Sequence, residues 1–286
     1  HETRRCLQEN QNDGELTWFD QACVPLPLQK PPRQFMLFVT YACNLRCPYC
    51  FAAGLQPDDM SWERAVGMLD WAVANQVETM TFCGGEPTRW AHFPAMLDEV
   101  KARGLNCYFA TNLLPRPGVM ERLTPDYVLS LIVHGALRSV YSDSQWNSFQ
   151  RHLEQVKNQG VKVALRINFY TQGQDWEHLF GLAERLGIDE FQLAMAFPGS
   201  AEKNAYVAVD NLQKMIPDIV TFMQACAERN WRTVFSKPLP PCLFPEAMQM
   251  RLLTEQQWSP MCSVGADGYT HNACVSPTGE VSPCLS

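Results

Sequence analysis

Short apolar runs alternate with helix-like segments from residue 35 onward. The runs are rich in β-branched and aromatic residues and predict strands. Six strand-then-helix units with short loops favour a parallel sheet, and right-handed crossovers would curl it into a barrel or partial barrel. The expected strands span 35–40, 78–83, 106–110, 127–133, 161–169 and 190–197, and the expected helices span 62–73, 93–103, 118–123, 143–159, 175–186 and 209–230.

Three cysteines follow the first expected strand in a C-x3-C-x2-C array. Asn44 and Pro48, which lie between Cys43, Cys47 and Cys50, favour irregular backbone. Thiolates this close in an irregular loop can converge on one metal centre. Three thiolates would leave one iron of a [4Fe–4S] cluster open, because such a cluster normally takes four cysteine ligands. The spacing alone is also compatible with a zinc site or with buried apolar cysteines.

A second motif follows the second expected strand. The strand ends in Gly84 and Gly85, followed by Glu86, which is typical of a strand that enters a tight turn. Glycines at this point would let a ligand approach the backbone closely.

Both motifs, in this order and each after a strand, resemble the signature of the radical S-adenosylmethionine (SAM) superfamily, including aromatic Tyr49 before the third cysteine. The resemblance covers about residues 35–200. It implies an α/β fold, an open (β/α)6 partial TIM barrel, with its chemistry at the carboxyl ends of the strands. It also implies that the three cysteines hold a [4Fe–4S] cluster whose open iron binds SAM. The Gly-Gly-Glu turn would hold the SAM amino group, and reductive cleavage of SAM would give a 5′-deoxyadenosyl radical.

Further residues are expected to face SAM. Asn112 ends the third strand, where the family often has Thr-Asn, although a plain turn cap would explain it equally well. Ile132 stands where many relatives carry a serine. Ser130 and His134 lie on the same strand face and are candidates to replace that serine, although a structural role is favoured for His134.

Arg166 interrupts an apolar strand and therefore needs an anionic partner. The SAM carboxylate is one candidate, because some relatives place an arginine on this strand. A protein carboxylate such as Glu86 is the alternative. Cys83 and Cys107, at or inside strands, are expected to be packed core thiols.

The alternation of strands and helices is expected to stop near residue 231, where proline becomes dense. Pro-Thr-Gly at 277–279, between two valine-containing arms, predicts a β-hairpin. The spacing from Gly279 to the last cysteine resembles the auxiliary-cluster hairpin of radical SAM twitch and SPASM extensions. That resemblance implies a second [4Fe–4S] cluster, with structural zinc as the alternative. The expected ligands are Cys242, Cys262, Cys274 and Cys284.

Three regions follow: an N-terminal extension (1–33), the partial barrel (34–230) and a twitch/SPASM-like auxiliary-cluster region (231–286). The extension is polar and then proline-rich. Its Cys6 and Cys23 have no near partner and are expected to be unligated. Alternatively, the extension crosses the barrel mouth and supplies a ligand or a substrate contact.

Composition limits the compartment and the partners. A net charge of −7 argues against nucleic acid bound by a general basic surface. No apolar run approaches the roughly 18 residues of a membrane span, and there is no secretory signal. Twelve cysteines in clustered spacing fit metal binding in a reducing cytoplasm better than a disulfide scaffold.

The resemblance implies a function. Twitch and SPASM relatives mostly modify peptides, so the expected substrate is a ribosomally made peptide that undergoes crosslinking, epimerisation or oxidation. The alternatives are a radical SAM dehydrogenase of a small molecule and a non-catalytic iron–sulfur or zinc protein. Flavodoxin or ferredoxin would donate the electron, and a separate protein could recognise a peptide leader.

Overall fold

One curved sheet organises the protein. The computed structural model describes residues 34–199, 201–236, 239–254 and 272–282. Within these residues the strands follow the order β7-β6-β5-β4-β3-β2-β1-β8-β9, and every neighbouring pair from β7 to β8 is parallel. The strands are β1 (Gln34–Thr40), β2 (Thr79–Gly84), β3 (Asn106–Thr111), β4 (Ser130–His134), β5 (Lys162–Phe169), β6 (Glu190–Met195), β7 (Arg232–Phe235), β8 (Asn272–Val275) and β9 (Val281–Ser282).

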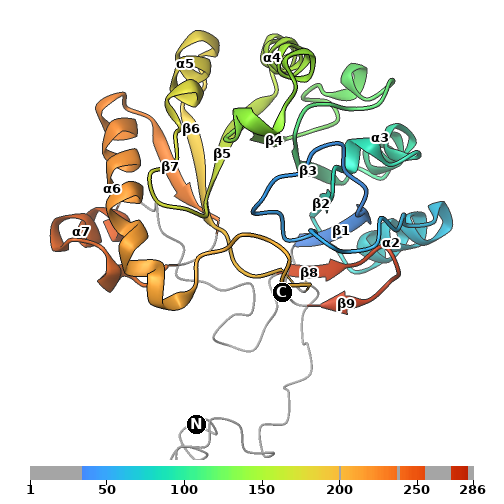
Figure 1. Ribbon diagram of the computed structural model, residues 1–286. Helices are drawn as coiled ribbons and strands as arrows, with labels where there is room; N and C mark the ends of the chain where they lie inside the picture. The colour runs from blue at the N-terminus through green and yellow to red at the C-terminus, as the bar shows by residue number, and fades with distance from the viewer. Residues whose placement is uncertain (1–33, 200, 237–238, 255–271, 283–286) are drawn as a thin grey trace, which may run out of the picture.

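Helices cover the outer face of this sheet (Figure 1). They are α2 (Trp62–Ala74), α3 (Phe93–Ala102), α4 (Asp143–Asn158), α5 (Glu177–Leu186), α6 (Leu212–Glu228) and α7 (Glu246–Thr254). The sheet does not close, because β7 and β9 stand at its two ends. The expected open α/β partial barrel is therefore confirmed. None of the described helices combines the length and the apolar composition that a membrane span requires.

The structure differs from the sequence expectation at several elements. A seventh parallel strand, β7, continues the sheet beyond residue 230, and its four residues are too few to give a clear periodic signal. Strand β4 begins at Ser130 rather than at residue 127, because Tyr127 N–H bonds to Thr124 O in a turn (3.0 Å). The helix expected at 118–123 is only a 3₁₀ turn at Met120–Arg122. Pro217 lies inside α6.

The expected hairpin is confirmed in the described residues, and its position is new. Strand β9 pairs antiparallel with β8, and Gly279 N–H closes the turn onto Ser276 O (3.0 Å). Gly279 has φ +95°, which glycine adopts at little cost. Strand β8 itself adds to the free edge of β1, in parallel. The tail therefore extends the barrel sheet.

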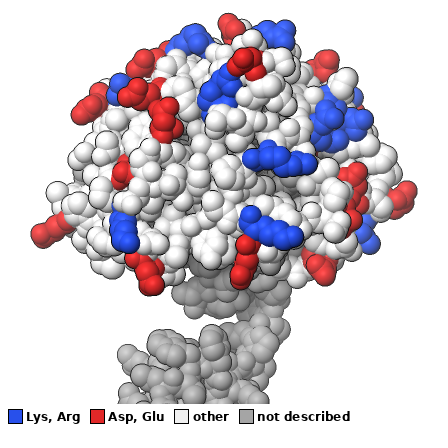
Figure 2. All heavy atoms as spheres, viewed as in Figure 1, with Lys and Arg blue, Asp and Glu red and all other residues white. Residues whose placement is uncertain are grey.

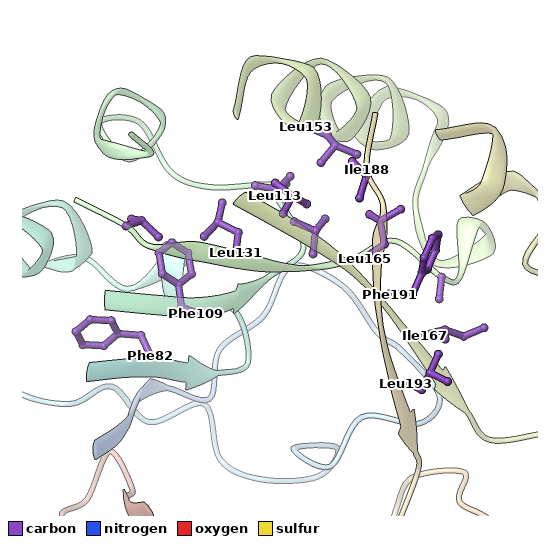
Figure 3. Packing of buried hydrophobic residues seen from close by; sticks show 14 of the residues in the cluster. Phe82, Phe109, Leu113, Leu131, Leu153, Leu165, Ile167, Ile188, Phe191 and Leu193 are labelled. Atoms are coloured by element: carbon purple, nitrogen blue, oxygen red, sulfur yellow. The ribbon is translucent and has the colours of Figure 1, made fainter. Parts of the chain in front are cut away.

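Alternation along the strands separates two environments. Outward-facing side chains such as Phe82, Phe109 and Phe191 are fully buried beneath the helices, where they form the main core (Figure 3). Burying each such aromatic side chain contributes roughly 2–3 kcal/mol. The inward-facing residues are more polar and line the barrel interior. The face of the sheet on which a side chain lies therefore decides whether it can reach a ligand in the barrel interior.

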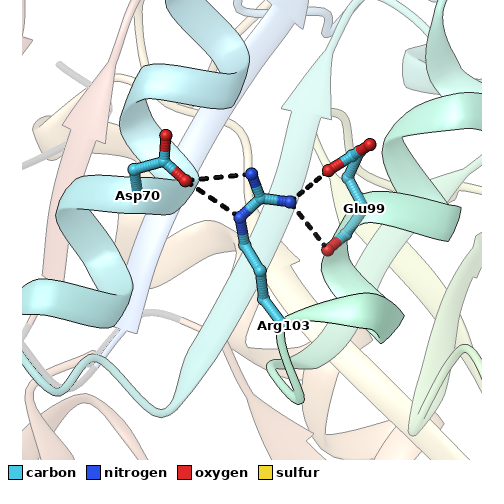
Figure 4. Close-up of polar contacts among 3 residues, drawn as sticks. All are labelled: Asp70, Glu99 and Arg103. Carbon is cyan, nitrogen blue, oxygen red and sulfur yellow. Dashed lines mark hydrogen bonds and ion pairs between the residues drawn. The ribbon is translucent and has the colours of Figure 1, made fainter.

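Arg103 joins α2 to α3 (Figure 4). Its Nε and Nη2 donate to Asp70 Oδ1 at 3.0 and 2.9 Å. Its Nη1 contacts the Glu99 carboxylate and donates to Glu99 O at 3.2 Å. The three groups are partly exposed, so the link contributes little free energy but sets how the two helices sit together.

Candidate active site

A cavity of about 210 Å³ opens at the carboxyl ends of the strands. That volume exceeds the space needed for a single water many times over. The cysteine loop (residues 41–58) and the loop after β6 cross this end of the barrel (Figure 1). The residues of the lining that carry polar groups are Cys43, Cys47, Tyr49, Cys50, Cys83, Glu86, Thr111, Asn112, Tyr141, His134, Arg166 and Asn168.

The structure brings the three cysteines of the array together in this lining. Burial raises the pKa of Cys43 to about 11, although a hydrogen bond from Leu45 N–H opposes the rise. Burial and the neighbouring thiols Cys50 and Cys43 raise the pKa of Cys47 to about 12. Burial also raises the pKa of Cys50. Thiols whose ionisation is opposed by burial would be stabilised as thiolates by a bound cationic centre.

A relay of amides orients the first cysteine. Asn112 Nδ2 lies 3.8 Å from Cys43 Sγ and donates to Asn44 Oδ1 at 2.8 Å. Asn44 Nδ2 in turn donates to Leu114 O (2.9 Å). The expected site residue Asn112 therefore faces the cysteine loop. It is also the turn cap that the sequence suggested, since its Oδ1 accepts from Leu114 N–H (3.0 Å).

Gly84 and Gly85 permit a close approach between two backbones. A Cβ added to Gly85 would lie 2.3 Å from Ala42 O, and one added to Gly84 would lie 2.0 Å from Thr40 O. Gly84 also has φ +148°. Gly85 N–H bonds to Thr40 O (2.8 Å), which fastens the turn after β2 to the root of the cysteine loop. Both glycines also line the cavity, so the expected approach of a ligand remains open.

Glu86 is buried, and both of its carboxylate oxygens accept hydrogen bonds from the protein. Its Oε1 accepts from Thr88 Oγ1 (2.6 Å) and Thr111 Oγ1 (2.8 Å), and its Oε2 accepts from Asn112 N–H (2.6 Å). Burial raises the pKa of Glu86, while these hydrogen bonds oppose the rise. The side chain therefore positions Asn112, and the alternative partnership with Arg166 is wrong.

Arg166 faces the cavity without a carboxylate partner among the described residues. Its Nη2 donates to Ser236 Oγ at 2.8 Å, and its buried Nε has no hydrogen-bond partner. Burial lowers the pKa of Arg166, while the neighbouring Cys83 and Tyr49 oppose that shift. An unpaired guanidinium in a largely apolar cavity favours an anionic ligand group.

His134 and Tyr49 stand on the same wall. Burial, and then the charge of Arg166, lower the pKa of His134 to about 3, so the imidazole is neutral near pH 7. Tyr49 donates to the Cys47 thiol and accepts from Asn168, whose Nδ2 also lies 3.4 Å from His134 Nδ1. The sequence analysis missed Asn168, although its place two residues after Arg166 puts it on the same strand face.

Other expected residues lie elsewhere or differ from expectation. Ser130 does not line the cavity: it starts β4 at the amino end, four residues before His134. Cys83 is part of the cavity lining rather than of the packed core, because it alternates with outward-facing Phe82. Cys107 is buried in the core as expected.

Two of the four expected tail ligands are described. Cys274 is buried on β8, with its Sγ 4.0 Å from Met36 Sδ, and Cys242 is exposed in a 3₁₀ turn. Cys262 and Cys284, like Cys6 and Cys23 of the extension, lie outside the described residues. The auxiliary site stays a prediction.

The chemistry of Cys43, Cys47 and Cys50 fits an iron–sulfur cluster. In the described part of the chain, no three His, Cys, Asp or Glu side chains form a group that could hold a single metal ion. A four-iron cluster is larger than one ion and takes its thiolates on different irons. Thiolates suit both iron–sulfur clusters and zinc, so the ligand types of the cysteine loop are compatible with a cluster, and the choice between cluster and zinc stays a prediction.

Comparison with curated proteins gives two kinds of relatives. The chain is 21% identical over 225 residues to a probable GTP 3′,8-cyclase of Metallosphaera sedula, covering 73% of this chain and 70% of that protein. It is 32% identical over 161 residues to the mycofactocin maturase MftC of Mycolicibacterium smegmatis, covering 52% of this chain and 41% of that protein.

Solved structures share the fold over most of the chain. SuiB of Streptococcus suis, solved with its precursor peptide SuiA, matches with a TM-score of 0.66 at 16% identity, covering 89% of this chain and 60% of SuiB. The enzyme anSMEcpe, solved with AdoMet and the Cp18Cys peptide, matches with a TM-score of 0.60 at 14% identity, covering 89% of this chain and 74% of that one.

The Radical SAM superfamily model matches residues 37–186, which include both motifs and the strands that carry them. The match spans more than half of the 286 residues. Members of this family use SAM and a [4Fe–4S] cluster, in agreement with a cavity that combines three thiols and an unpaired guanidinium. The chain therefore belongs to the radical SAM superfamily.

Proposed function

We propose that Cys43, Cys47 and Cys50 hold a [4Fe–4S] cluster and that SAM binds beside it in the cavity. The observation that carries this proposal is the convergence of three thiols and the unpaired Arg166 on one lining. When bound, and given one electron by an external donor, the cluster would supply the reductive cleavage of SAM to methionine and a 5′-deoxyadenosyl radical, which would remove a hydrogen atom from the substrate.

The protein's own residues bind and orient. Arg166 pairs with the SAM carboxylate, because its Nε lacks a partner and no described carboxylate reaches it. The backbone of Gly84, Gly85 and Glu86 receives the SAM amino group. Asn112 and Tyr49 act on the cluster side, where they lie against Cys43 and Cys47. His134 stays neutral and adds no further positive charge beside Arg166.

Arg166→Gln tests the SAM site. On anaerobically reconstituted protein, SAM binding should weaken about tenfold or more, since a hydrogen bond to a charged group contributes about 1.5–3 kcal/mol. Iron content should stay unchanged, because Arg166 donates to Ser236 and makes no hydrogen bond to the cysteine loop among the described residues. Arg185→Gln, on the exposed face of α5, is the matched control. Equal SAM affinity in parent and Arg166→Gln would overturn this assignment.

The proposed substrate is a ribosomally synthesised peptide, which would undergo crosslinking, epimerisation or oxidation. The similarity to a maturase, MftC, and to SuiB and anSMEcpe, both solved with peptides, supports it. The chain spans 41% of MftC and 60% of SuiB, so the peptide substrate is carried over to this chain as a proposal. The GTP 3′,8-cyclase relatives favour the second candidate, a small-molecule substrate.

Parallel incubations with the two kinds of substrate separate these two candidates. The reconstituted enzyme is incubated with SAM, a reductant and either the peptide encoded beside its gene or GTP. Maturation predicts a changed peptide mass or changed residue chirality, with unconsumed GTP. Consumed GTP and an unchanged peptide would reverse the preference, and no SAM cleavage after full cluster loading would favour a non-catalytic iron–sulfur protein.

A second [4Fe–4S] cluster on Cys242, Cys262, Cys274 and Cys284 remains part of the proposal, with zinc as the alternative. Iron analysis and Mössbauer spectra of the parent and of a Cys43/Cys47/Cys50→Ala triple variant distinguish the two. About eight irons in the parent and about four in the variant would support two clusters. About four irons in the parent and none in the variant would mean that the tail cysteines bind zinc or only pack. We further propose a cytoplasmic location, a flavodoxin or ferredoxin electron donor and a separate leader-recognition protein.

A further inference from the structure

The loop after β6 lies directly on the turn that joins the second and third cysteines. This loop, residues 196–208 without residue 200, is called the β6 loop below. Only Pro48 and Tyr49 stand between Cys47 and Cys50, and the backbone carbonyls of both are bonded to the β6 loop. Ala205 N–H donates to Pro48 O (2.7 Å), and Asn204 Nδ2 donates to Tyr49 O (3.3 Å).

Asn204 is built into this contact. The residue is only 7% exposed. Besides Tyr49 O, its Nδ2 donates to Phe197 O (2.9 Å), and its Oδ1 accepts from Gly199 N–H (2.8 Å). One amide therefore closes the β6 loop on itself and fastens it to the cysteine loop. No other side-chain type of this size offers two donors and an acceptor in one plane.

Steric contacts show that the two loops approach each other closely at two further points. A Cβ added to Gly199 would lie 2.3 Å from Phe51 O, and one added to Gly54 would lie 2.4 Å from the Lys203 side chain. The β6 loop thus contacts the cysteine loop on both sides of Cys50. At its other side the β6 loop forms part of the cavity wall, through Phe197 and Pro198.

The orientation of the Cys47–Cys50 turn determines where two thiolates point. Cys50 N–H bonds to Cys47 O (3.1 Å), which makes the turn and holds the Tyr49–Cys50 peptide at its N–H, but this bond leaves the Pro48–Tyr49 peptide free to rotate. The bond from Ala205 holds the Pro48–Tyr49 peptide at its carbonyl, and the bond from Asn204 holds the Tyr49–Cys50 peptide at its carbonyl as well. A turn held before the cluster binds need not lose that freedom on binding.

We propose that Asn204 is a positioning residue for the cluster: it holds the Cys47–Cys50 turn so that both thiolates meet the irons in one geometry. This inference rests on the proposed function, because it requires a cluster on these cysteines. Asn204 does not touch the reacting atoms, and it acts through the backbone of Tyr49.

The test uses the full chain, reconstituted anaerobically, with Asn204→Ala and Asn204→Asp variants. Asn75→Ala is the matched control, because Asn75 Nδ2 also donates to a backbone carbonyl, Trp71 O, at 2.8 Å, but at the exposed end of α2. Leu153→Ala, on the buried face of α4, controls for loss of global stability. The readouts are the rate of iron release to a chelator and the electron paramagnetic resonance spectrum of the reduced cluster.

Asn204→Ala should release iron at least fivefold faster than the parent and change the resonance spectrum. Asn204→Asp keeps the acceptor for Gly199 but loses both donors, so it should behave like Asn204→Ala. Asn75→Ala and Leu153→Ala should both keep the resonance spectrum of the parent. Asn75→Ala should also release iron at the rate of the parent. Gly199→Ala, which should push the β6 loop off Phe51, is an independent variant with the same expected result.

The outcomes separate the two proposals. A parent that loads a cluster, with an Asn204→Ala variant that keeps both the release rate and the spectrum, overturns the role of Asn204 alone. A spectrum that changes equally in Leu153→Ala also overturns it, since general destabilisation would then explain the result. A parent that takes up no cluster overturns the proposed function and this inference with it.

Discussion

Glu86 and Asn112 are joined by a 2.6 Å hydrogen bond from the Asn112 backbone N–H to the buried Glu86 carboxylate. The Asn112 side chain then faces Cys43 Sγ at 3.8 Å. A carboxylate after β2 thereby sets the end of β3, and the end of β3 orients the first cysteine of the array. The acidic residue of the Gly-Gly-Glu motif has a structural task in this chain, whatever its backbone does for SAM.

Glu86→Gln should destabilise the protein by roughly 2 kcal/mol or more, although it removes a buried charge. A glutamine side chain brings an NH₂ group toward N–H and O–H donors, so at least one buried donor loses its acceptor. Urea unfolding of the cluster-free protein measures the effect. Glu99→Gln, at a partly exposed carboxylate, should change stability by less than about 1 kcal/mol. Equal effects at the two positions would contradict the structural role of Glu86.

Gly85→Ala should fold less stably, by about 2 kcal/mol or more, and should load little iron. Its Cβ would meet Ala42 O at 2.3 Å and Tyr41 O at 2.5 Å, so the cysteine loop has to move. Gly181→Ala is the matched control, because nothing lies within 4 Å of a Cβ at that helical position. It should be neutral or more stable by about 0.5–1 kcal/mol. Full iron content in Gly85→Ala would show that the close backbone approach is dispensable.

Stability should fall as pH falls from 7 to about 5.5, in part because of His134. The pKa of His134 is lowered to about 3 in the folded protein, so the unfolded chain takes up a proton near pH 6.5 that the folded chain refuses. Its contribution is present above about pH 6.5 and is lost progressively below it, amounting to roughly 1 kcal/mol by pH 5.5.

His134→Gln should remove that part of the pH dependence in urea titrations at several pH values. Asn168→Ala, which deletes the neighbour of His134 at 3.4 Å but keeps the imidazole, is the control and should retain the slope. An unchanged slope in His134→Gln would mean that His134 is protonated in the folded protein as readily as in the unfolded chain.

Arg103→Met should cost about 0.5–1 kcal/mol at low salt, because it removes the contacts to Asp70 and Glu99 while it keeps an unbranched side chain. The loss should shrink in about 0.5 M salt, since partly exposed charges are screened. Iron content should not change, as α2 and α3 carry none of the cavity lining. A loss that grows with salt would assign the effect to packing instead.

Periodicity in the sequence predicted a parallel α/β sheet and the order of its first six strands, and the resemblance to the superfamily implied that the sheet is open; β7 and the place of β8 beside β1 were not predicted. The residues that face the cavity also follow from the sequence, because side chains alternate along a strand. Arg166 and His134 point inward for that reason, and Asn168 would have been found by the same rule. The strand ends likewise put the cysteine loop and the Gly-Gly-Glu turn at one edge of the sheet.

Only the tertiary structure decided which residues meet across the chain. Asn204 and Tyr49 are 155 residues apart in sequence, and no local pattern marks Asn204 as the residue that holds the cysteine turn. The same holds for β8 beside β1 and for the backbone contact that requires Gly85. Local propensity depends on a few neighbouring residues, whereas these contacts depend on how all the packed layers come together. The sequence by itself therefore determined the kind of fold and which residue types lie at the carboxyl ends of its strands, and packing determined how those residues are held in place.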